Sequence, residues 1–106
     1  MSIKELTTVL QELASASRSI ANESDFLKVI KKYDMLFLGE NFNHIYSLEL
    51  RHTLEKEFDI KTSNEELNSL IPTACESLGM KFTPMFPIKS LSRSDQEPYC
   101  YQIILW

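Results

Sequence analysis

Glycine is scarce in this sequence of 106 residues, with only Gly39 and Gly79. Loops that hold phosphate groups need several glycines close together, because their backbone must approach the ligand. Two glycines so far apart cannot build such a loop, and neither flanks a serine in the GxSxG motif of many hydrolases. We therefore expect a protein that is not an enzyme, with no catalytic residues and no bound cofactor.

Histidine is equally scarce, and metal sites need clusters of ligands. His44 and His52 are the only histidines. If both lie on one straight helix, about 12 Å separates them along its axis, which is too far for them to share an ion. Glu49 and Glu55 flank His52 at helical spacing, so we expect a histidine–carboxylate pair there. The sequence predicts no metal site.

Long apolar runs and cysteines are also few. The sequence has no stretch of 18 apolar residues, so we expect no membrane-spanning helix. Glu5 stands where a secretory signal requires positive charge, which predicts a cytoplasmic protein. Cys75 and Cys100 are then expected to be reduced, buried side chains rather than a disulfide.

The composition that remains is that of an ordinary globular domain, with 43% hydrophobic and 25% charged residues. A chain of this length is expected to form one domain over residues 1–106, around one hydrophobic core. The net charge of -4 disfavours bulk attraction to nucleic acid or to an anionic membrane, although it allows a local basic patch.

Helical periodicity dominates the first third of the chain. Residues 2–5 form a Ser-x-x-Glu capping box before the first apolar stripe, which fades in the Ser/Ala-rich residues 14–19. Asn22 or Ser24 is expected to cap a second helix. Residues 35–38 are ambiguous, because they suit either an extension of that helix to a glycine C-cap or a short buried strand. The two stripes consist of Ile3, Leu6, Leu10 and Leu13, and of Phe26, Val29, Ile30 and Tyr33.

Two further helices are expected in the middle of the chain. The third begins near Asn43, and a capping box formed by Ser63 and Glu66 marks the start of the fourth. Gly79 ends the fourth helix, and Pro72 inside it predicts a kink or a restart. The third stripe consists of Tyr46, Leu50, Leu54 and Phe58, and the fourth of Leu67, Leu70, Ile71, Ala74 and Leu78.

The pattern changes to that of strands in the last quarter of the chain. Residues 81–86 and 99–106 are rich in aromatic and β-branched side chains, and the polar residues 89–98 predict a long hairpin loop between them. Pro84 and Pro87 confine the first strand to a sheet edge or to broken pairing. The expected fold is therefore α+β, with three to four helices followed by a C-terminal β-hairpin, in the element order of a winged helix. Such a fold does not fix the function.

A winged-helix regulator inserts its recognition helix into the major groove, where lysine, arginine and amide side chains meet phosphates and bases. Residues 63–79 contain no lysine or arginine and three glutamates, which oppose a phosphate backbone. Asn64 and Asn68 alone do not offset that charge. A winged-helix DNA-binding transcriptional regulator is therefore kept as the alternative function, and nucleic acid is disfavoured as a partner.

Carboxylates and aromatic side chains remain as a surface for a protein partner. Four carboxylates, those of Glu57, Asp59, Glu65 and Glu66, lie within ten residues at the junction expected between the third and fourth helices. Tyrosines are enriched at binding hot spots. We expect a non-enzymatic protein-binding module, a small acidic inhibitor of the immunity or antitoxin type that neutralises a basic partner such as a nuclease toxin. The hairpin is the other candidate surface. The expected partner-binding residues are Glu57, Asp59, Glu65, Glu66, Tyr46 and Tyr99.

Overall fold

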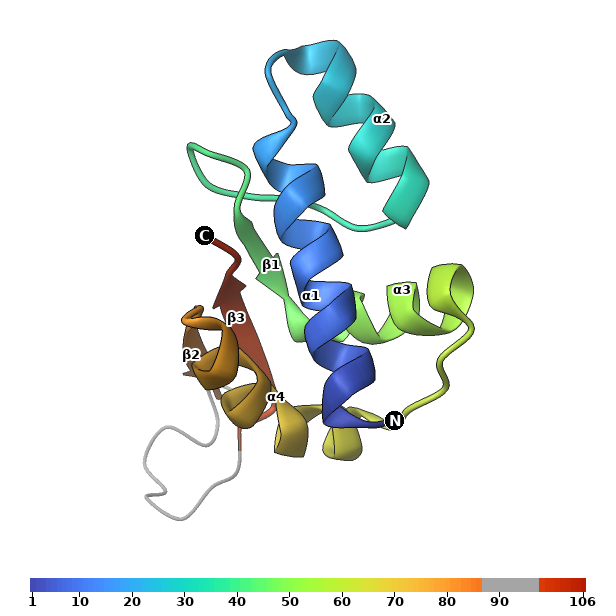
Figure 1. The fold of residues 1–106 in the computed structure, drawn as a ribbon, viewed down its shortest axis with the longest axis vertical. Coiled ribbons are helices and arrows are strands. Elements are labelled where there is room, and N and C mark those ends of the chain that lie inside the picture. The colour runs from blue at the N-terminus through green and yellow to red at the C-terminus, as the bar shows by residue number, and fades with distance from the viewer. Residues whose placement is uncertain (87–97) are drawn as a thin grey trace.

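The computed structural model describes residues 1–86 and 98–106. Within these ranges the chain forms four helices and a three-stranded antiparallel sheet (Figure 1). The α+β class predicted from the sequence is therefore confirmed. Among the described residues, no helix combines the length and the apolar character that crossing a membrane requires.

The first helix, α1, spans Ile3–Arg18 and begins with the predicted capping box. It runs down the middle of the view in Figure 1. The Ser/Ala-rich stretch stays helical because its last turn is held by long-range hydrogen bonds. The buried hydroxyl of Ser17 donates to the carbonyl oxygen of Phe42 at 2.6 Å and accepts from the indole N–H of Trp106 at 2.9 Å.

The second helix, α2, spans Glu23–Tyr33, and the side chain of Asn22 caps it as predicted. It ends at Asp34, which adopts a left-handed conformation with φ of 51°. The extension to a glycine C-cap at Gly39 is therefore wrong, because Asp34 already takes the left-handed position. Residues 35–38 form neither a helix nor a full strand. Leu38 makes a single antiparallel bridge with His44.

The third helix begins later than the sequence indicates. The strand β1 spans His44–Tyr46, and α3 spans Ser47–Phe58. The helix start predicted near Asn43 is wrong because this segment pairs with the end of the chain. The carbonyl oxygen of Asn43 accepts from the N–H of Leu105 at 2.8 Å, and its side-chain amide donates to the carbonyl oxygen of Trp106 at 2.6 Å. His44 consequently lies on a strand, on a different element from His52.

The fourth helix, α4, spans Asn64–Leu78 and continues through Pro72 instead of restarting there. Gly79 ends it in the left-handed region, with φ of 71°, as glycine does at helix C-termini. Half of the predicted capping box is present, since the Ser63 side chain accepts from the N–H of Glu66 at 3.0 Å. The Glu66 carboxylate instead accepts from the N-terminal amine of Met1 at 2.8 Å.

The sheet has the strand order β1-β3-β2, so the last strand lies in the centre. The strand β2 spans Lys81–Met85 and β3 spans Cys100–Ile104, and the two pair antiparallel as a hairpin. Pro84 lies on the edge strand, which confirms the prediction made for it. Pro87 and most of the hairpin loop predicted over 89–98 lie outside the described residues.

The hydrophobic core lies where α1, α3 and α4 meet one face of the sheet. The register pairs Ile45 and Phe82 with Ile103, which places these three on the same face. Leu70, a member of the predicted apolar stripe of α4, is only partly buried, whereas Leu67 and Ile71 of the same stripe are fully buried. The fully buried apolar residues, at 0% exposure, are Leu6, Leu10, Leu13, Ile45, Leu50, Leu54, Leu67, Ile71, Ala74, Cys75 and Ile103.

Candidate partner-binding surface

The four predicted carboxylates lie at the two ends of the connection between α3 and α4. Glu57 belongs to the last turn of α3, and Asp59 follows it in a left-handed conformation with φ of 54°. Glu65 belongs to the first turn of α4. All three are exposed, and none forms an ion pair with a described residue. The α3–α4 connection therefore presents three exposed carboxylates to solvent, with the exposed Lys61 between them.

Glu66 differs from the other three carboxylates because it is already paired. Its carboxylate lies 2.8 Å from the N-terminal amine of Met1. The hydrogen bond from this amine lowers the pKa of Glu66, and the same bond raises the pKa of the amine. The structure therefore leaves Glu57, Asp59 and Glu65 as the carboxylates whose charge is available to a partner.

The two predicted tyrosines lie on different parts of the sheet. Tyr46 is half-buried at the end of β1, where its backbone is opposite Gln102 of β3. Tyr99 precedes β3, three residues or about 10 Å from Gln102 along the strand, and it is 49% exposed. Its carbonyl oxygen accepts hydrogen bonds from the side-chain amides of Asn64 and Asn68, each at 3.1 Å. The backbone of Tyr99 is therefore bound to the first turns of α4.

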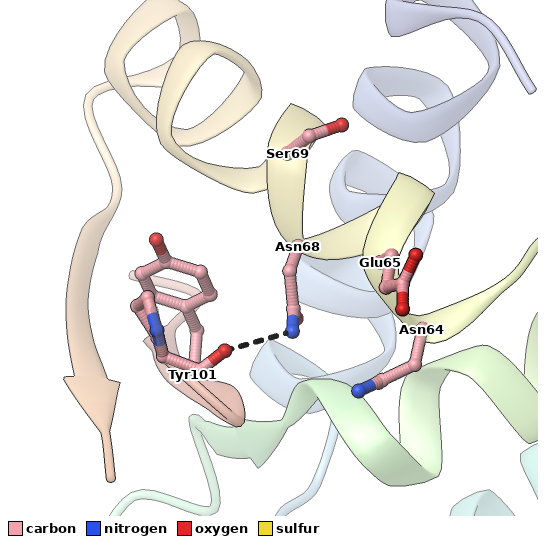
Figure 2. A pocket seen from close by; sticks show the side chains of 6 residues that line it. Asn64, Glu65, Asn68, Ser69 and Tyr101 are labelled. Carbon is pink, nitrogen blue, oxygen red and sulfur yellow. Dashed lines mark hydrogen bonds between the residues drawn. The ribbon is translucent and has the colours of Figure 1, made fainter. Parts of the chain in front are cut away.

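A pocket of about 260 Å³ lies between the first turns of α4 and the start of β3. Figure 2 shows that Asn64, Asn68 and Ser69 come from one helix and that Tyr101 lies across the pocket from them. We call this the α4–β3 pocket. The residues that line the pocket are Asn64, Glu65, Asn68, Ser69, Pro98 and Tyr101.

From the sequence, Asn64 and Asn68 were interpreted only as side chains that could contact DNA bases. Their spacing of four residues indicates that they share one face of a helix.

The polar groups of the pocket make several hydrogen bonds within the protein. Asn68 uses both of its amide N–H groups, since it also donates to the carbonyl oxygen of Pro98 at 3.3 Å, whereas Asn64 uses one. The hydroxyl of Ser69 donates to the carbonyl oxygen of Glu66 at 2.6 Å. The side-chain oxygen of Asn64 is buried and has no hydrogen-bond partner among the described residues. The pocket therefore contains one buried acceptor, the oxygen of Asn64, that the described residues leave unsatisfied.

A second polar cluster joins α2 to α3 and corrects the expected pairing of His52. The Nε2 atom of His52 lies 3.1 Å from Oδ2 of Asp34, which also accepts from Nζ of Lys56 at 2.9 Å. Glu49, an expected partner of His52, instead accepts from the N–H of Leu36 at 3.3 Å. Lys56 first, and His52 second, lower the pKa of Asp34. His52 pairs with Asp34 because the left-handed conformation of Asp34 at the end of α2 places the Asp34 carboxylate beside α3.

The groups that could perform other chemistry are separated or buried. Within the described part of the chain, no three histidine, cysteine or acidic side chains are grouped as metal ligands. Cys75 and Cys100 are buried and unlinked. Burial raises the pKa of the Cys75 thiol to about 11, so the thiolate needed for nucleophilic attack is scarce at neutral pH.

Comparison of the chain with family models, with curated proteins and with solved structures gave no match. The exposed carboxylates and the α4–β3 pocket are therefore the observations that bear on function.

Proposed function

We propose that this chain is a non-enzymatic, cytoplasmic protein-binding module that neutralises a basic protein, as immunity proteins and antitoxins neutralise nuclease toxins. The observation that carries the proposal is the surface formed by the exposed carboxylates of Glu57, Asp59 and Glu65, none of them in an ion pair with a described residue, beside the α4–β3 pocket. Exposed carboxylates steer a cationic partner toward the surface and set its orientation. Tyr99 adds a large exposed aromatic side chain, of the kind enriched at binding hot spots.

The second candidate is a winged-helix DNA-binding regulator. The observation that favours it is the order of the elements, with α3 and α4 followed by the paired strands β2 and β3. The charge on α4 opposes it, because the exposed side chains of this helix include Glu65, Glu66 and Glu76 and no cation. A DNA backbone rewards lysine and arginine at the positions that approach it. We therefore rank DNA binding second.

The deciding experiment changes the charge of the α3–α4 connection without touching the pocket. The test variant carries Glu57→Lys and Asp59→Asn, since asparagine tolerates the left-handed backbone at position 59. A matched control carries Glu23→Lys and Glu40→Gln, which change the net charge equally at exposed positions on other elements. Wild type is used to isolate partners from host cells, and the binding of each isolated partner is then measured with all three proteins.

The proposal predicts a single basic protein partner. The test variant should associate more slowly and bind this partner about tenfold more weakly, because steering depends on exposed charge near the interface. The control should bind as wild type does. If the partner fraction is nucleic acid, and if the test variant binds duplex DNA more tightly than the control, the proposal is wrong and the regulator takes its place.

A further inference from the structure

We infer that the α4–β3 pocket receives an arginine side chain of the basic partner, an inference that rests on the proposed function. The first step is the hydrogen-bond polarity of the pocket. Most of the described side-chain donors at its lining are already used within the protein, by both N–H groups of Asn68, one of Asn64 and the hydroxyl of Ser69. The oxygen of Asn64 and the carboxylate of Glu65 remain as acceptors. A cationic group that brings several donors fits these two acceptors.

The buried oxygen of Asn64 supplies the second step. A buried polar atom without a partner destabilises the folded protein, so a ligand that donates to it recovers a cost already present in the protein. Less than 1 Å² of this oxygen is accessible, so the Asn64 side chain has to turn toward the pocket to meet a donor. The carbonyl oxygen of Tyr99 tolerates this turn because Asn68 also donates to it, at 3.1 Å.

The shape of the pocket favours a guanidinium group over an ammonium group. Guanidinium is planar and carries five N–H donors, so one group can donate to the oxygen of Asn64 and to the carboxylate of Glu65 at once. It also stacks on aromatic faces, and Tyr101 lies across the pocket from the helix (Figure 2). Glu65 in the first turn of α4 supplies the compensating charge. An ammonium group has three donors around one atom and gains less from such separated acceptors.

The test uses the full chain labelled with ¹⁵N and titrated with N-acetyl-arginine amide, while nuclear magnetic resonance follows the side-chain amides. The Asn64 and Asn68 amide signals should shift in a saturable manner. The dissociation constant should be about millimolar, as the small size of the probe allows. N-acetyl-citrulline amide, which has the same shape without the charge, is the matched probe and should leave these signals in place. Equal shifts with citrulline, or no saturable shift with arginine, would overturn the inference.

Two variants separate the pocket from the rest of the surface. Asn64→Leu removes the buried acceptor, and Asn68 still satisfies the Tyr99 carbonyl, so the fold should persist while the arginine shifts disappear. Asn64→Asp adds a carboxylate in the first turn of a helix, where negative charge is favourable, and it should tighten arginine binding several-fold. Unchanged arginine binding in both variants would also overturn the inference.

The two proposals can fail separately. If Glu57→Lys with Asp59→Asn weakens a basic partner but Asn64→Leu does not, the pocket inference is wrong and the proposed function stands. If arginine binds the pocket but no basic partner is found, the proposed function is wrong. Equal losses of partner affinity from both changes support the two proposals together.

Discussion

A buried hydroxyl should hold α2 onto the rest of the protein. Thr53 is fully buried on α3, and its hydroxyl donates to the carbonyl oxygen of Tyr33, the last residue of α2, at 2.7 Å. Thr53→Val keeps the branched shape of the side chain and removes only the donor. The carbonyl at the end of α2 then loses its buried partner.

The magnitude follows from the burial of that carbonyl. Leaving a buried acceptor without its donor costs about 1–3 kcal/mol. In a domain of this size about 1 kcal/mol corresponds to 4–8 °C in melting temperature, so Thr53→Val should lower the melting temperature by roughly 10 °C. Thr8 is the matched control, because it is exposed and its hydroxyl donates to the carbonyl oxygen of Lys4 within α1. Thr8→Val should change the free energy of unfolding by less than about 0.5 kcal/mol.

Chemical denaturation and hydrogen exchange would test this reasoning. The Thr53→Val variant should unfold at lower denaturant concentration, and the amides of α2 should exchange faster than those of α4. The α2 helix is singled out because it lies at the top of the view in Figure 1, farther from the sheet than the other helices. Equal stability of Thr53→Val and Thr8→Val would refute the argument. A loss of stability without faster exchange in α2 would show that the hydroxyl does not act on that helix.

Three further outcomes are expected. Ile71→Ala, at a fully buried position, should cost about 2–5 kcal/mol in thermal unfolding. The lowered pKa of Asp34 means that its stabilising contribution is present above the ordinary value of 3.8 and is lost as the pH falls through the lower folded value. Asp34→Asn should therefore be less stable than wild type at pH 6, and the difference should vanish in strong acid. Cys75 and Cys100 should react with a thiol reagent at pH 8 only after denaturant is added, since burial raises the pKa of both thiols.

Local sequence signals located the structural features that depend only on neighbouring residues. The capping box at residues 2–5 and the side-chain cap at Asn22 are where the sequence predicts them, because both are made within one helical turn. The start of α3 was misplaced for the opposite reason. Asn43 bonds with Leu105 and Trp106, which lie at the other end of the sequence, and the residues that follow it join the sheet.

The candidate site was only partly accessible to sequence reasoning. The run of carboxylates from Glu57 to Glu66 is visible in the sequence, but the pairing of Glu66 with the terminal amine is not. The α4–β3 pocket could not be predicted because it depends on the approach of Tyr99 to Asn64, which is 35 residues away in the sequence. Likewise, His52 pairs with Asp34, 18 residues before it, and not with a carboxylate at helical spacing.

The central position of β3 has a consequence for how the protein is made. The strands β1 and β2 each pair with β3 and not with one another. While the chain is being synthesised from its N-terminus, β1 and β2 therefore have no sheet to join until residues 100–104 have emerged. The apolar side chains of α3 and α4 that pack against β3 stay exposed until the same event. A nascent chain of this kind completes its fold late, and until then its exposed surface makes it a candidate client for chaperones.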